Sequence, residues 1–196
     1  MPRRRRLPRS FYARDPREVA PDLLGTLLVH DGRVVRLVEV EAYCGAEDPG
    51  SHAYRGPTPR TEVMFGPPGH LYVYFSYGMH WCANVVCGRE GEAGAVLLRA
   101  GAPVAGLDAI RAARPKARRD RDLTSGPARL CQALGIDGTF DGADLVRADR
   151  GVTLATDGEP LTVAPATSPR IGLSQGADLP WRWYLPGHPH VSAKPR

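Results

Sequence analysis

Two glutamates, Glu39 and Glu41, are the first residues of this chain whose type and spacing could carry chemistry. They lie two positions apart in a stretch that reads as a β-strand, so both side chains point to one face, which they share with apolar residues. A carboxylate placed in this way can deprotonate an attacking water and stabilise positive charge that develops on a sugar. Glutamates on a solvated strand face are the ordinary alternative, and the apolar neighbours count against it.

Tyrosines form a second set of candidates. Tyr43 ends the glutamate stretch, Tyr72 and Tyr74 alternate on one face of a predicted strand, and Tyr77 stands in the turn that follows. Flat rings on rigid strands are suited to stacking on nucleic-acid bases. Tyrosine is also common in strands, so the pattern favours base binding only in combination with a basic surface.

Positive charge is concentrated in two segments of a chain whose formal net charge is +5. One is residues 3–6, and the other, residues 111–121, holds Arg111, Arg114, Lys116, Arg118, Arg119 and Arg121. Such segments favour a polyanionic partner, most often nucleic acid. Solvated surface, or an arm that aids solubility, would explain the same charge.

A serine-hydrolase motif also occurs, with Ser174 between Gly172 and Gly176 and with Asp178 and His188 after it. The nucleophile elbow of that class needs a strand before the serine and a helix after it. Here Pro180 follows closely and few residues remain, so we do not expect a serine esterase.

No metal or cofactor is expected. The cysteines, which are Cys44, Cys82, Cys87 and Cys131, have no Cys-x-x-Cys spacing. His188 and His190 have no further ligands at metal-binding spacing.

The elements that position these residues are predicted to be hairpins rather than strand–helix–strand units. Residues 26–30 and 33–43 flank an Asp-Gly turn, and residues 71–76 and 81–87 flank a turn that contains Tyr77. Between the hairpins, residues 44–70 form a long loop, which is often functional. Further strands are predicted at 95–100, 152–155, 161–164 and 181–185.

Helices are predicted at residues 107–114 and from Ser125 as N-cap to Gly135. The first helix should begin at Asp15-Pro16, with Glu18 completing a capping box. The fold class is therefore α+β, a largely antiparallel curved sheet with a protruding hairpin and short flanking helices.

The chain is predicted to form a flexible basic arm over residues 1–14 and a single domain over residues 15–196. No apolar run approaches the roughly 18 residues that span a membrane, and no apolar stretch follows the basic N-terminus. We therefore expect a cytoplasmic protein, associated with the nucleoid if it is bacterial.

Taken together, the sequence resembles the alkyladenine (3-methyladenine) DNA glycosylase family. The stretches that carry the resemblance run in family order and cover most of the chain from about residue 16: VEVEAY at 38–43, EDPGSHAYRG at 47–56, LYVYFSYGMHWCANVV at 71–86, GAVLLRA at 94–100, SGPARLCQALGI at 125–136 and SPRIGL at 168–173.

The resemblance implies a role for individual residues. Glu41 is similar to the general base that activates water, and Arg99 and the Ile171 carbonyl are similar to the groups that help hold that water. Tyr43 and His52 would stack on one face of a flipped base and Tyr74 on the other. Tyr77 resembles the residue that fills the gap left in the duplex, and Asn84 the residue of the pocket floor that rejects normal guanine.

The implied activity is excision of 3-methyladenine, 7-methylguanine, hypoxanthine and ethenoadenine from double-stranded DNA, which the protein would bind through the minor groove as a monomer. The enzyme should be monofunctional and leave an abasic site, because its lysines, Lys116 and Lys194, lie away from the strands that carry Glu41 and the tyrosines. A non-catalytic nucleic-acid binder is the rival interpretation, and it would have no need of Glu41.

Overall fold

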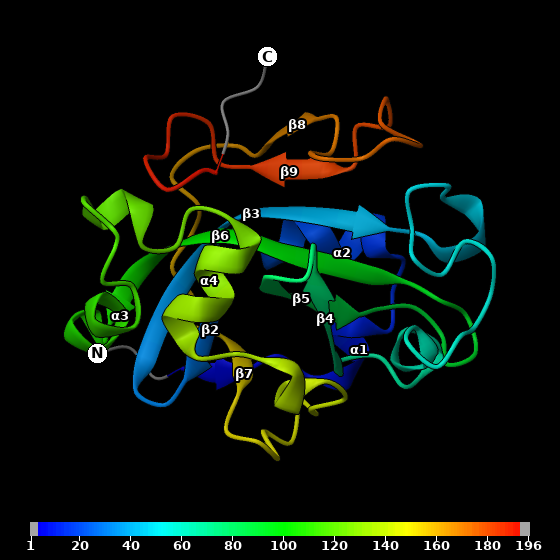
Figure 1. Ribbon diagram of the computed structural model, residues 1–196, viewed down its shortest axis with the longest axis horizontal. Coiled ribbons are helices and arrows are strands. Elements are labelled where there is room, and N and C mark those ends of the chain that lie inside the picture. Colours follow the sequence, from blue (N-terminus) through cyan, green and yellow to red (C-terminus); the bar gives the residue numbers. More distant parts are fainter. Residues whose placement is uncertain (1–3, 193–196) are drawn as a thin grey trace.

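The protein folds into an α+β domain built on one curved antiparallel sheet, as the sequence predicts (Figure 1). The computed structural model describes residues 4–192. Within that range the main path of the sheet runs β1-β7-β2-β3-β6-β5-β4, and β9 pairs with both β3 and β8. The strands are Arg5–Arg6 (β1), Leu27–His30 (β2), Arg33–Tyr43 (β3), Leu71–Ser76 (β4), His80–Val86 (β5), Ala95–Ala105 (β6), Thr153–Thr156 (β7), Ala166–Ser168 (β8) and Arg182–Tyr184 (β9).

Short helices flank this sheet. They are Arg9–Tyr12 (α1), Pro16–Leu23 (α2), Leu107–Ala113 (α3) and Pro127–Leu134 (α4), with single 3₁₀ turns at Gly45–Glu47 (η1), Glu62–Phe65 (η2), Asp120–Asp122 (η3) and Gly138–Phe140 (η4). In Figure 1, α4 crosses in front of β6 and α2 lies behind it. Among the described residues, no helix is both long and apolar enough to cross a membrane.

Strand β3 is the centre of the fold because it pairs with β2, β6 and β9. The β2–β3 hairpin turns at Asp31 and Gly32, whose φ angles of 48° and 72° match the two-residue turn expected from an Asp-Gly pair. The pairing of β3 with β6 shifts register around Leu37 and Glu39. Such irregularities bend a strand, and here the bend comes where the glutamates begin.

The second hairpin, β4–β5, forms one edge of the sheet and joins it through β5 and β6. A small cluster of buried residues, which includes Met64, Tyr72 and Val86, packs the long loop against this hairpin. The hairpin is thereby anchored at its base, and its tip at Tyr77 stays exposed.

The helix ends differ in part from the predicted ones. The Asp15 side chain accepts a hydrogen bond from the Arg17 N–H, as a cap should, without the predicted contribution of Glu18. The N-cap of α4 is Gly126 rather than Ser125, while Gly135 ends that helix in the left-handed conformation as expected. The predicted strand at residues 161–164 is wrong, and the nearby strand is β8.

The predicted flexible arm at residues 1–14 is also corrected by the structure from Arg5 onward. Strand β1 pairs with β7, and Leu7 and Tyr12 are buried in the main core. The Tyr12 ring packs so closely on Gly69 that a Cβ atom at position 69 would lie 2.8 Å from a carbon of that ring. The neighbouring arginines make this segment look like a solvated arm in the sequence, although Leu7 and Tyr12 anchor it to the core. Residues 1–3 of the predicted arm lie outside the described range.

This docking predicts that Tyr12→Ala lowers the free energy of unfolding by about 3–5 kcal/mol, the usual cost of removing a buried aromatic ring. Arg4→Ala, an exposed position, should change it by less than about 0.5 kcal/mol. Denaturant unfolding followed by circular dichroism measures both. If Tyr12→Ala and Arg4→Ala both changed the free energy of unfolding by the same small amount, the N-terminal segment would not be packed against the core.

Candidate active site

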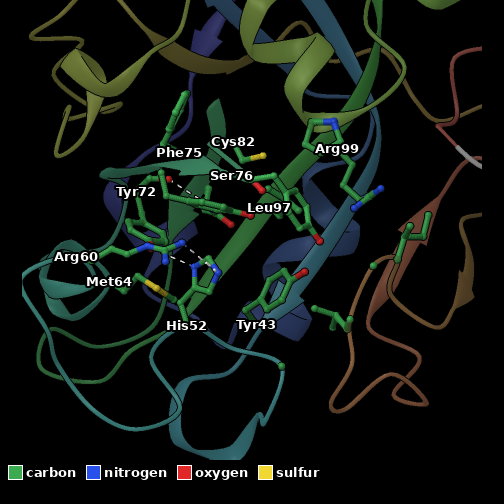
Figure 2. Close-up of a pocket in the computed structure, with 18 residues that line it drawn as sticks. Tyr43, His52, Arg60, Met64, Tyr72, Phe75, Ser76, Cys82, Leu97 and Arg99 are labelled. Carbon is green, nitrogen blue, oxygen red and sulfur yellow. Dashed lines mark hydrogen bonds between the residues drawn. The ribbon is translucent and has the colours of Figure 1, made fainter. Parts of the chain in front are cut away.

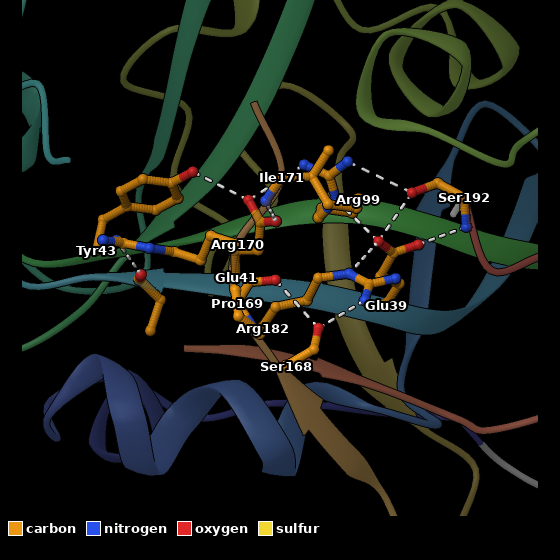
Figure 3. Close-up of polar contacts among 11 residues, drawn as sticks. Glu39, Glu41, Tyr43, Arg99, Ser168, Pro169, Arg170, Ile171, Arg182 and Ser192 are labelled. Carbon is orange, nitrogen blue, oxygen red and sulfur yellow. Dashed lines mark hydrogen bonds and ion pairs between the residues drawn. The ribbon is translucent and has the colours of Figure 1, made fainter. Parts of the chain in front are cut away.

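The side chain of Glu41 is fully buried and is held from three directions (Figure 3). Its Oε2 accepts hydrogen bonds from the Tyr43 hydroxyl at 3.0 Å and from Arg99 Nη1 at 3.1 Å. Its Oε1 accepts one from the Ile171 backbone N–H at 2.8 Å. The predicted site residues therefore do come together: Glu41, Tyr43, Arg99 and Ile171. The Ile171 contact uses the backbone N–H, so the role predicted for the Ile171 carbonyl stays a prediction.

The hydrogen-bond capacity of Glu41 is not exhausted by these donors. A carboxylate has about four lone-pair sites, and the donors from Tyr43, Arg99 and Ile171 fill three of them. The remaining site is on Oε1, which accepts a single hydrogen bond here.

Glu39 is the second buried carboxylate, and it performs a different task from Glu41. Its Oε1 accepts from Arg99 Nε at 2.9 Å and from Arg182 Nε at 2.8 Å, and its Oε2 accepts from the Ser192 N–H at 2.6 Å. Burial alone would raise the pKa of Glu39, but the charges of Arg99 and Arg182 outweigh it and hold that pKa below its usual value. Glu39 thus stays ionised and fixes Arg99 between the two carboxylates.

A cavity of about 420 Å³ is lined in part by Arg99, the arginine that contacts both carboxylates (Figure 2). That volume lies within the roughly 300–1,000 Å³ typical of small-ligand pockets. Every predicted substrate-binding residue lines it, and its lining comprises Tyr43, Gly50, His52, Arg60, Met64, Tyr72, Tyr74, Phe75, Ser76, Tyr77, Cys82, Asn84, Leu97, Arg99, Pro127, Ile171, Gly172 and Leu173. Tyr43, Arg99 and Ile171 belong to this wall, so Glu41 lies one hydrogen bond behind it.

The aromatic side of the cavity is formed by His52, Tyr72 and Tyr74. The His52 ring meets the Tyr74 ring edge-on at 4.6 Å between centroids, and its Nδ1 lies 3.1 Å from the Tyr72 hydroxyl. At that separation no third ring fits between His52 and Tyr74, so a base held between them requires that one ring moves aside. Partial burial and the charge of Arg60 lower the pKa of His52, which therefore presents a neutral ring.

Asn84 lies at the point where β5 pairs with both β4 and β6. Its Nδ2 donates to the Tyr72 carbonyl at 3.1 Å, which fixes the amide in one orientation. The amide is buried and still lines the cavity. A group so restrained can exclude ligands by shape.

Tyr77 stands at the tip of the β4–β5 hairpin with 85% of its surface exposed. The Met79 N–H donates to the Ser76 carbonyl, and the two residues between them, Tyr77 and Gly78, have φ angles of 50° and 63°. A left-handed conformation is unfavourable for a bulky residue such as tyrosine, and strain of this kind concentrates at functional sites. The turn thus leaves an aromatic ring largely exposed while it still contributes to the lining of the cavity.

A buried ion pair between Asp48 and Arg170 supports the site and was not singled out from the sequence. Arg170 Nη1 and Nη2 donate to the two Asp48 oxygens at 2.5 and 2.7 Å. The guanidinium carbon also lies 4.6 Å from the Tyr43 ring centroid and 5.2 Å from that of Trp181. Both charged residues stand within stretches that carry the family resemblance, but 122 positions separate them, and no local pattern links them.

Other candidates from the sequence form no comparable site. Ser174 lies among turns, with no strand directly before it and no helix after it, so the nucleophile elbow is not formed. Within residues 4–192, no group of three or more histidine, cysteine, aspartate or glutamate side chains could hold a metal ion.

Comparison with known proteins identifies the family of this chain. The model of the methylpurine-DNA glycosylase family matches residues 10–189. A protein of Burkholderia lata is 57% identical over 95% of this chain and 90% of its own, and one of Carboxydothermus hydrogenoformans is 50% identical over 96% and 99%. A Streptomyces avermitilis protein is 50% identical over 97% of this chain and 92% of its own.

All three relatives bear the name "Putative 3-methyladenine DNA glycosylase". The family match covers most of the chain and spans every predicted site residue, from Glu41 to Ile171. The resemblance inferred from the motifs is confirmed: the chain belongs to the methylpurine-DNA glycosylase family.

Proposed function

We propose that this protein excises alkylated or deaminated purines from double-stranded DNA by hydrolysis of the N-glycosidic bond, with Glu41 activating the attacking water. The observation that carries the proposal is the position of Glu41, one hydrogen bond behind the wall of a cavity lined by tyrosines and with one acceptor site left for water. The substrates are 3-methyladenine, 7-methylguanine, hypoxanthine and ethenoadenine.

In this proposal Arg99 orients Glu41 through the hydrogen bond from its Nη1 to Oε2. The water donates a proton toward Glu41 and attacks the sugar carbon while the bond to the base breaks, and the carboxylate stabilises the cationic sugar. Excision therefore depends on the Glu41 side chain behind the cavity, and the Ile171 carbonyl is proposed as a further acceptor for the water.

A purine within the duplex conceals its glycosidic bond, so the nucleotide must be flipped into the cavity. Tyr77 would enter the stack from the minor groove and occupy the gap, which the exposed, strained turn supports. Tyr43 and His52 would stack on one face of the base and Tyr74 on the other, after His52 and Tyr74 separate. Asn84 would reject the amino group of normal guanine.

The proposed enzyme is monofunctional and acts as a monomer. Backbone cleavage by a glycosylase commonly requires an amine that forms a Schiff base with the sugar. Lys116 lies in the basic segment after α3 and does not line the cavity, and Lys194 lies outside the described residues. A water is therefore the nucleophile that the site favours, and the product is an intact abasic strand.

Glu41→Gln tests the water mechanism. The substitution should reduce the single-turnover rate of hypoxanthine excision by about 10²–10⁴-fold, the usual contribution of a general base, because an amide cannot take the proton. Binding to a duplex with an abasic analogue, measured by fluorescence anisotropy, should remain nearly unchanged.

Glu39→Gln is the matched control for that variant. It removes the charge that Arg99 and Arg182 share but keeps an amide oxygen that can accept from Arg99 Nε, so Arg99 stays oriented. The variant should chiefly lower stability, by about 3–5 kcal/mol, and affect the rate far less at a temperature where it is folded. Equal rate losses in the two variants would contradict the assignment of Glu41 as the base.

Tyr77→Ala tests the wedge. Loss of the ring should weaken the complex with a flipped nucleotide by a few kcal/mol, since nothing then fills the gap. The loss should be smaller when the damaged base lies opposite a mismatch, where flipping is already easier. Met79→Ala, at another exposed residue of the hairpin tip, serves as control. The same loss on matched and mismatched duplexes would argue against a wedge.

A further inference from the structure

The charged residues that line the cavity are both arginines, Arg60 and Arg99. The nearby carboxylates, Glu39 and Glu41, are fully buried and do not reach its surface. A ligand in the cavity therefore meets positive charge first, although the tyrosine cage by itself would attract a cation.

The two arginines differ in how their charge is balanced. Arg99 lies 2.9 Å from Glu39 and 3.1 Å from Glu41, so it is neutralised by two carboxylates. Arg60 has no carboxylate within ion-pair distance among residues 4–192. Its charge is therefore the uncompensated one at this cavity.

Arg60 also lies close to two of the rings that line the cavity. Its guanidinium carbon lies 5.4 Å from the centroid of the Tyr74 ring, and its Nη2 lies 3.5 Å from Nε2 of His52 (Figure 2). The cation–π position on Tyr74 is thus already taken by a residue of the protein. A positively charged purine must compete with Arg60 for that ring, whereas a neutral purine loses nothing to charge repulsion.

We propose that Arg60 is a specificity-determining residue that shifts selection in this cavity from cationic toward neutral damaged purines. The inference rests on the proposed function and names its favoured substrate class. Hypoxanthine and ethenoadenine are neutral purines, and 7-methylguanine carries positive charge on its ring. Arg60 disfavours the charged base both by repulsion and by holding the face of Tyr74.

Arg60→Gln should therefore raise the ratio of 7-methylguanine to hypoxanthine excision. We expect a change of about two- to fivefold in the ratio of single-turnover rates, the range that one exposed cation–π contact supplies. Both bases are placed in the same duplex sequence and opposite the same partner. Arg60→Lys, which keeps the charge, should keep the ratio closer to that of the unaltered protein.

Arg55→Gln is the control for net charge, because Arg55 lies exposed in the same loop and does not line the cavity. It should leave the ratio unchanged. The proposed role of Arg60 would be overturned if Arg60→Gln excised both bases with an unaltered ratio of rates. An equal shift of that ratio in Arg55→Gln would overturn it as well. If the unaltered protein excised neither base, the proposed function would fall, and this inference with it.

Discussion

Arg99 bridges two buried carboxylates of the same strand, and the candidate site depends on that bridge. Glu39 and Glu41 point the same way from β3, so without a cation between them their charges would repel one another in a medium that screens poorly. Arg99 comes from β6, which is paired with β3 along its length. The sheet thus supplies the geometry, and Arg182 from β9 adds a second charge behind Glu39. One carboxylate is free for chemistry because the other holds the arginine in place.

The same sheet separates rigid from adaptable parts of the molecule. Glu41, Arg99 and Asn84 lie on central strands and are buried, so their positions are set by backbone pairing. The groups that would meet DNA, Tyr77 at the hairpin tip and Arg60 in the long loop, are exposed. This division suits a DNA glycosylase of base-excision repair, in which the reacting groups must be fixed while the surface adjusts to an extruded nucleotide.

Much of this arrangement could be predicted from the sequence because it follows from local patterns. The Asp-Gly turn, the alternation that puts Glu39 and Glu41 on one face, and the hairpin tip at Tyr77 all depend on neighbouring residues. Two other pairings could not be predicted from the sequence, those of Asp48 with Arg170 and of Glu39 with Ser192, because tertiary folding alone brings residues so distant in sequence together. The N-terminal segment was missed because its arginines outnumber Leu7 and Tyr12, which nonetheless anchor it. The opposition of Arg60 to a cationic base likewise depends on how a loop folds over Tyr74.

We propose above that Glu41 and a water excise the base and leave the strand intact. The most direct test is incubation of the protein with a hypoxanthine-containing duplex in the presence of borohydride, followed by analysis of the strand before and after hot alkali. Our account predicts release of free hypoxanthine, an unbroken strand that alkali then cleaves at the lesion, and no covalent complex between protein and DNA. A trapped complex would contradict the water mechanism, and binding without any alkali-dependent break would identify a nucleic-acid binder instead of an enzyme.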